Sequence, residues 1–237
     1  MMKFNLNRPF KWGELNCIEF ETKIGIDAYR VLNKNQEESL LLIKQKFEDD
    51  LKAVEKLDPI ELEHQGSFYY QIAEREEMII EELQRQQRYA ICLSIFSFLE
   101  GRLKSICDKI EQRFEFKIKL DDLNKRNDLM RYWNYLVKIY EIDVQKITPF
   151  FTPLKNQKIV RNIIAHQDGI ISKEQKGKIN IVSGLGKKQI DNELRIEIKD
   201  TSYNIYLLEK IEVFFEKLLF AIDKRDKEKE LDNNERR

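Results

Sequence analysis

The stretch of sequence that decides the fold is Tyr89–Ile110, YAICLSIFSFLEGRLKSICDKI. Its apolar positions are separated alternately by three and four residues: Tyr89, Cys92, Phe96, Leu99, Leu103, Ile106 and Ile110. This period places one continuous apolar stripe along an α-helix, and such a stripe packs against nearly antiparallel neighbouring helices. We therefore predict that this segment is the central helix of a helical bundle.

The composition of the 237-residue chain favours the same fold class. Eight glycines and four prolines are too few for the turns of a β-sandwich or a doubly wound α/β protein. The apolar fraction of 42% suits one globular domain with a core of its own. The chain begins without an apolar signal region, and its longest apolar stretch is too short to span a bilayer. We therefore expect a cytoplasmic protein with no membrane partner.

The N-terminal part of the chain, residues 1–66, is predicted to form a strap and accessory helices. Phe4, Phe10, Trp12 and Phe20 lack a helical period and predict an irregular strap over residues 1–22. A helix is predicted at about 24–57, with a break at 33–35. Asp58 and Pro59 then have the residue types of an N-cap and a first helical position, and a second start lies after Gly66.

Residues 67–222 are predicted to form the bundle, in which a central helix at 67–114 either bends or protrudes as an arm. Helices follow at 121–140, from Thr152–Pro153 to a stop at Gly169, and at 202–222. Alternating apolar residues at 178–183 and 194–199 predict an inserted β-hairpin. The charged tail, 223–237, is expected to fray.

Cysteine and histidine content argues against a metal site or a disulfide framework. The three cysteines form no CxxC pair, and an odd number of them indicates reduced thiols. The chain has two histidines, His64 and His166, and no Cys/His cluster of the kind that binds zinc. We expect neither a metal nor a cofactor.

The most informative motif is Lys158–Gly169, KIVRNIIAHQDG, in which four residues separate Arg161 from His166 and Asn162 follows the arginine. It resembles the signature of the HEPN superfamily, all-α domains that are often metal-independent endoribonucleases. The resemblance extends to the run Phe96–Gly101 and to the bundle layout. It implies a HEPN-like helical bundle with Arg161, Asn162 and His166 as catalytic residues, acting on RNA as a toxin or phage-defence effector, with an antitoxin or other regulatory protein as a possible partner.

The residue types suit metal-free RNA cleavage on chemical grounds as well. A histidine can remove the 2′-OH proton or protonate the leaving 5′ oxygen, and an arginine binds phosphate oxygens while remaining charged. Asn162 would hold the imidazole or a phosphate oxygen. On one helix Arg161 lies roughly 140° around from His166. Two copies related by a two-fold axis could supply both residue types to one cleft, so we expect a homodimer.

The charge around the motif supports an anionic partner. Residues 152–190 contain eight basic and two acidic side chains, a net charge of +6, although Lys plus Arg and Asp plus Glu are equal, at 42 each, over the whole chain. We predict that Lys155, Lys158, Lys187 and Lys188 bind substrate. Glu100 is a candidate to orient Arg161 or His166, and the alternative is that it flanks the apolar stripe and faces water.

A different function class stays open at this point. His166 could simply complement the negative end of its helix dipole, and Arg161 could be a solvated or ion-paired surface residue. The protein would then be a catalytically silent HEPN-like module that binds a protein partner or a nucleotide through its long arm. A buried, ion-paired Arg161 would favour this alternative.

Overall fold

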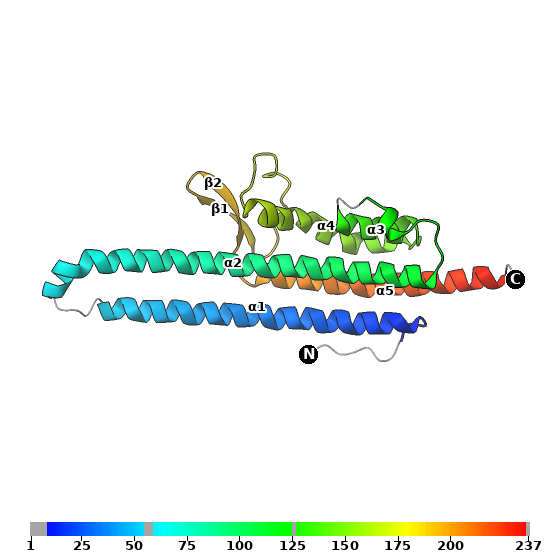
Figure 1. The fold of residues 1–237 in the computed structure, drawn as a ribbon, viewed down its shortest axis with the longest axis horizontal. Coiled ribbons are helices and arrows are strands. Elements are labelled where there is room, and N and C mark those ends of the chain that lie inside the picture. Colours follow the sequence, from blue (N-terminus) through cyan, green and yellow to red (C-terminus); the bar gives the residue numbers. More distant parts are fainter. Residues whose placement is uncertain (1–8, 55–58, 125–126, 236–237) are drawn as a thin grey trace.

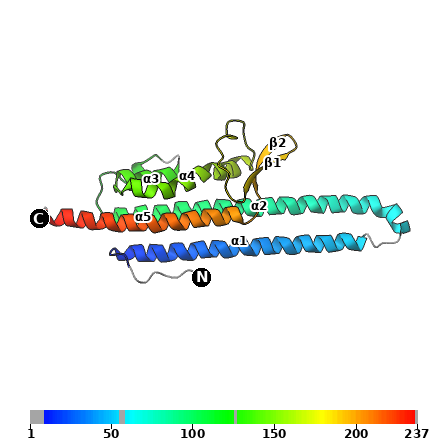
Figure 2. The same ribbon diagram turned by 180° about the vertical axis from the view of Figure 1, so that it is seen from behind.

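The computed structural model describes residues 9–54, 59–124 and 127–235, and the fold is mostly helical. Three long helices lie side by side: α1 (Gly13–Val54), α2 (Pro59–Arg113) and α5 (Ser202–Glu235). The shorter helices α3 (Asp128–Lys138) and α4 (Val144–Gln167) lie on the opposite side of α2 and α5 from α1 (Figures 1 and 2). The prediction of a mostly helical protein is confirmed.

The predicted apolar stripe of α2 is buried and forms the centre of the core. Leu99, Leu103, Ile106 and Ile110 have no exposed surface, and Tyr89 and Phe96 are nearly as buried. The helix is 55 residues long and passes through Gly66 without the predicted second start. It bends near its N-terminal end, and its first half extends with the end of α1 beyond the other helices (Figure 1). We call residues 38–54 and 59–84 the arm.

The predicted irregular strap at 1–22 is wrong for residues 13–22, which belong to α1. Phe10, Trp12, Leu15 and Ile18 are buried in the same core as α2 and α5, and residues 1–8 lie outside the described part. The predicted break at 33–35 is also wrong. Asn33 is buried there, donates to the backbone oxygen of Thr201 and accepts from Asn204, so its amide is satisfied within a continuous helix.

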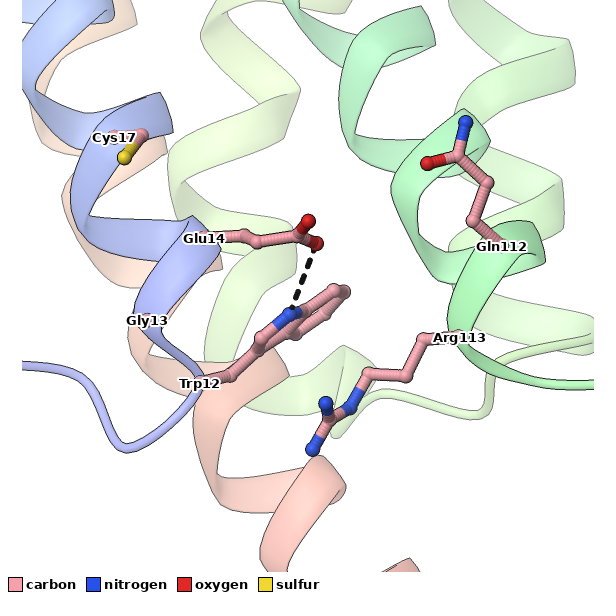
Figure 3. Close-up of a pocket in the computed structure, with 6 residues that line it drawn as sticks. All are labelled: Trp12, Gly13, Glu14, Cys17, Gln112 and Arg113. Atoms are coloured by element: carbon pink, nitrogen blue, oxygen red, sulfur yellow. Dashed lines mark hydrogen bonds between the residues drawn. The ribbon is translucent and has the colours of Figure 1, made fainter.

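The charged tail continues α5 instead of fraying from residue 223. Asp223 is buried and accepts hydrogen bonds from the backbone amides of Lys11 and Trp12, which anchors the start of α1. Asp226 is buried and pairs with Arg113 through both carboxylate oxygens, at 2.6 and 3.0 Å. Arg113 also lies over the Trp12 ring, and Figure 3 shows these two residues side by side. Ion pairing between helices therefore stabilises the start of the charged tail, whose composition had predicted fraying.

The helix predicted at 121–140 is shorter than expected. Residues Leu120–Asp122 form one 3₁₀ turn, and α3 begins at Asp128, where the side chain of Asn127 accepts from the amide of Met130. The predicted N-cap at Asp58 lies outside the described residues, while Pro59 is the first residue of α2, as its position predicted.

Thr152 and Pro153 do not begin a helix, because α4 begins at Val144 and contains Pro149 and Pro153 in its interior. The apolar residues Ile147, Phe151 and Leu154 are buried on both sides of Pro153. Their common burial keeps the helix continuous although proline contributes no amide donor. The hydroxyl of Thr152 donates to the oxygen of Thr148 instead of capping a helix.

The predicted β-hairpin exists, but its first strand was misplaced. Strand β1 is Leu185–Ile190 and pairs antiparallel with β2, Glu193–Ile198, so residues 178–183 precede the sheet. Asp191 and Asn192 form the two-residue turn, and Asp191 has a φ of 49°. The alternating pattern at 178–183 lies in a connecting loop, whereas the real strand has Lys187, Lys188 and Gln189 in its middle.

Candidate active site

The motif residues lie in the last two turns of α4, which ends at Gln167. Asp168 and Gly169 follow with φ values of 49° and 82°, and the amide of Gly169 donates to the oxygen of Ile163. A side chain at Gly169 would collide with the hydroxyl of Tyr89, 2.2 Å from the position of a Cβ atom. The predicted stop at Gly169 is therefore confirmed, with the left-handed backbone beginning one residue earlier.

Arg161 is half-buried and is paired with no carboxylate among the described residues. Its Nη1 donates to Oδ1 of Asn162 at 3.3 Å, and its Nε is buried without an acceptor. Burial raises the pKa of the Cys92 thiol on α2 to about 12, and the charge of Arg161 opposes this rise. The guanidinium thus lies near enough to α2 for its charge to act on a buried thiol there, and its Nε donates to no described protein group.

The lack of a carboxylate partner distinguishes Arg161 from most of the other described arginines. Ion pairs or carboxylate hydrogen bonds are formed by Arg30, Arg85, Arg88, Arg102, Arg113, Arg131, Arg195 and Arg225. Arg75 is the other described arginine for which no carboxylate partner is present, and it is exposed on the arm. A half-buried arginine with unused donors is the arrangement expected of an anion site.

Asn162 and His166 are both exposed and lie four residues apart on one face of α4. The imidazole of His166 has no hydrogen-bond or ion-pair partner among the described residues, so both ring nitrogens are open to solvent or to a ligand. Within a single chain, Arg161 and His166 share no hydrogen bond. One protomer therefore presents the three motif residues without closing a site around them.

The carboxylate of Glu100 forms no hydrogen bond with Arg161 or His166 among the described residues. It accepts from Nζ of Lys158 at 2.8 Å, and the same ammonium also donates to Oδ1 of Asn127. Both members of the Lys158–Glu100 pair are largely buried, so Lys158 is neutralised within the protein. The pair ties α4 to α2, which makes Lys158 a weak candidate for direct contact with substrate.

The other predicted substrate-binding lysines are spread over the surface. Lys155 is exposed on α4, one helical turn before Ile159. Lys187 donates to the backbone oxygen of Lys176 at 2.7 Å. Lys188 lies 3.9 Å from the carboxylate of Glu81, and both of these side chains are about half exposed or more. Only Lys155 and Lys188 therefore offer an ammonium group without a close partner.

A charge cluster at the end of α4 was not predicted from the sequence. The carboxylate of Asp168 accepts from Arg85 of α2 at 2.9 Å and from Arg195 of β2 at 3.1 Å. Arg85 also pairs with Glu82, and Arg195 with Glu193. Hydrogen bonds from Arg85 and the charge of Arg195 hold the pKa of Asp168 below its usual value. The only local signal for this cluster was the acidic residue two positions after His166.

No group of three or more His, Cys, Asp or Glu side chains that could hold a metal ion occurs in the described part of the chain. Among the same residues, no helix is both long enough and apolar enough to cross a membrane. Comparison with known proteins finds no matching family model, no matching curated protein and no matching solved structure.

Proposed function

We propose that the protein is a metal-independent endoribonuclease of the HEPN type, with Arg161, Asn162 and His166 as its catalytic residues. The observation that carries the proposal is Arg161, a half-buried guanidinium with a buried, unused Nε and no carboxylate partner in the described part of the chain. A buried, ion-paired Arg161 would have favoured the silent alternative, and no ion pair of Arg161 is present among the described residues. A phosphate group is a ligand that a guanidinium without a carboxylate partner would bind.

Each motif residue has a distinct task in this proposal. His166 exchanges a proton with the 2′-OH nucleophile or with the leaving 5′ oxygen. Arg161 stabilises the charge that develops on the pentacoordinate phosphorus, and Asn162, which accepts a hydrogen bond from Arg161, keeps the guanidinium in place. The 2′ oxygen bonds to phosphorus as the bond to the 5′ oxygen breaks, which leaves a 2′,3′-cyclic phosphate and a 5′-OH.

The active form that we propose is a homodimer in which two α4 helices face each other. The exposure of Asn162 and His166 on one side of α4 leaves that side available to a second copy. A two-fold axis beside α4 would bring two arginines and two histidines into one cleft. A role as a toxin or phage-defence effector, with or without an antitoxin, follows from the HEPN resemblance alone.

A second candidate function is protein binding through the arm. The arm exposes large apolar side chains, and exposed apolar surface of this kind marks interaction sites. These side chains are Leu41, Leu42, Phe68, Tyr70, Met78 and Ile79. In this case Arg161 and His166 would be dispensable for the biological effect, and the protein would have no nuclease activity.

The deciding experiment compares His166→Ala, Arg161→Ala and Arg75→Ala proteins, each first shown to be folded by circular dichroism. Loss of proton transfer should reduce cleavage of RNA by about 10² to 10⁴ in His166→Ala, while RNA binding survives. Arg161→Ala should lose both binding and cleavage, because the guanidinium contacts phosphate in the ground state and more strongly in the transition state.

Arg75→Ala is the matched control, because it removes the same charge from an exposed position on the arm. It should cleave RNA as the parent does. If His166→Ala and Arg161→Ala also cleave RNA and affect cell growth like the parent, the nuclease proposal is wrong and the protein-binding function replaces it.

A further inference from the structure

A cleft of about 760 Å³ lies at the base of the arm, between α2 and the β-hairpin. Its volume is in the range of sites that hold small organic ligands or a nucleotide. One wall is a face of α2 that includes Met78, Arg85 and Tyr89, and Lys44 of α1 completes it. The other wall is the hairpin, whose position above α2 is visible in Figure 1.

Alternation along the strands decides which hairpin side chains face the cleft. Lys188, Ile190, Arg195, Glu197 and Lys199 line it and belong to one face of the hairpin, while Ile196 and Ile198 of the opposite face also line it but are buried. Lys187 precedes Lys188 and points to the opposite face, where it donates to the oxygen of Lys176 and does not line the cleft. Two neighbouring lysines of one strand thus have different surroundings.

The arginines of the cleft are occupied by protein groups. Arg88 pairs with Glu37 and donates to two backbone oxygens, while Arg85 and Arg195 share Asp168. These residues hold the hairpin, α2 and the end of α4 in a fixed relation. They shape the cleft and leave Lys44, Lys188 and Lys199 as the basic side chains available to a ligand, beside the acidic lining residues Glu81, Glu82 and Glu197.

The three lysines of the cleft keep ammonium groups that are available to a ligand. Lys44 donates to the neutral amide of Gln84 at 3.2 Å. Lys188 lies 3.9 Å from Glu81 in a pair that is largely solvated, and Lys199 is exposed. Neither Lys44 nor Lys199 forms an ion pair with any carboxylate that the structure describes. Three such ammonium groups around one cleft can bind phosphate oxygens.

The cleft also adjoins the motif. Arg85 and Arg195, which line it, bind Asp168, two residues beyond His166. At its rim Met78 and Ile190 expose apolar surface, 60% and 38% of each residue. An RNA strand that extends from the motif past Asp168 would place its phosphates near the lysines and its bases against these apolar side chains.

We propose that this cleft binds the phosphate groups of nucleotides, as the part of an RNA strand next to the scissile bond. The proposal rests on the proposed nuclease function for the identity of the strand. Phosphate recognition by Lys44, Lys188 and Lys199 does not depend on it, since a free nucleotide offers the same chemistry.

The test measures binding of a fluorescently labelled 2′-O-methyl RNA oligonucleotide, which lacks the nucleophile and cannot be cleaved. The parent is compared with a triple variant, Lys44→Ala, Lys188→Ala and Lys199→Ala, at salt concentrations from about 50 to about 200 mM. Loss of three phosphate contacts should reduce the slope of log binding constant against log salt concentration by about 2. The ratio of the parent's affinity to that of the triple variant should therefore fall by about 20-fold between the lowest and the highest salt concentration. The triple variant Lys34→Ala, Lys46→Ala and Lys52→Ala is the matched control, because it removes the same charge from positions of α1 outside the cleft.

Single variants sharpen the test. Lys188→Ala should weaken binding by several-fold more than Lys187→Ala, although the two residues are adjacent in the sequence. AMP, ATP and inorganic phosphate are titrated in parallel. Binding of these small ligands with the same lysine dependence identifies a free nucleotide as the natural source of the phosphate, whereas binding of the oligonucleotide alone identifies the strand.

The proposal is overturned if the cleft triple variant binds the oligonucleotide and the nucleotides as the parent and the control triple variant do. This failure is distinct from failure of the nuclease function. If cleavage depends on His166 while the cleft variants bind normally, only the proposal for the cleft is wrong. If the parent protein cleaves no RNA but binds the probes in a lysine-dependent way, only the proposed nuclease function is wrong.

Discussion

Replacement of Gly169 by alanine tests how the end of α4 is held. Gly169 has a φ of 82°, and a Cβ atom there would lie 2.2 Å from the hydroxyl oxygen of Tyr89. That hydroxyl donates to the backbone oxygen of Ile196 at 2.5 Å in a buried position. The substitution therefore combines backbone strain with displacement of a buried side chain.

The magnitude follows from these two costs. A left-handed conformation costs a residue with a Cβ atom about 1–2 kcal/mol. A buried carbonyl oxygen that loses its donor costs about 1–3 kcal/mol. A smaller loss of backbone entropy on folding offsets part of this, by about 0.4–1 kcal/mol. We expect Gly169→Ala to lower the free energy of unfolding by about 2–4 kcal/mol, which corresponds to a Tm lower by roughly 5–15 °C.

Thermal and urea unfolding followed by circular dichroism measure this change. Gly101→Ala is the matched control, because Gly101 lies within α2 and no atom is within 4 Å of its added Cβ. It should be neutral or stabilising by about 0.5–1 kcal/mol. In a Tyr89→Leu background the collision disappears, so Gly169→Ala should then cost only the backbone strain. Equal midpoints for Gly169→Ala and Gly101→Ala would refute the reasoning.

Three further predictions concern the site and its surroundings. Cleavage should persist in excess EDTA and yield 2′,3′-cyclic phosphate ends from RNA but no products from an all-deoxy strand; strict dependence on added magnesium would contradict the mechanism. Light scattering at micromolar concentration should show a dimer, and a monomer whose specific activity is unchanged on dilution would contradict the composite site. Arg85 lowers the pKa of Asp168 and of Glu82, so both carboxylates stabilise the folded state above their unfolded pKa values of about 4 and lose this effect as pH falls through the lower folded values. The difference in unfolding free energy between the parent and Arg85→Gln should therefore narrow between about pH 5 and pH 3, and a difference that widens in acid would contradict the assignment.

The sequence by itself predicted features that depend on short-range periodicity. The spacing from Tyr89 to Ile110 identified the buried side of α2 because residues three and four apart share one helix face. The left-handed stop at Gly169 followed from glycine itself, and the spacing of Asn162 and His166 placed them on one side of α4. The HEPN resemblance, the RNA substrate and the dimer stay predictions.

Errors arose where a segment takes its conformation from distant parts of the chain. The tail past residue 222 is helical because Asp223 and Asp226 are buried against the start of α1 and the end of α2. Residues 13–22 are helical because their apolar side chains share the core of α2 and α5. The first strand of the hairpin is a polar segment that pairs with β2, although the segment before it alternates better.

Tertiary structure alone decided which charges are free. The sequence contains equal numbers of acidic and basic residues. Which of these side chains form ion pairs with one another does not follow from the sequence. Glu100 pairs with Lys158, 58 positions away, and Asp168 with Arg85, 83 positions away, whereas Arg161 meets no carboxylate among the described residues. Helix periodicity depends on residues three or four positions apart, so it can be read from the local sequence. An ion pair depends on how whole helices pack, because a Coulomb interaction is felt only when folding brings the two groups within a few ångströms.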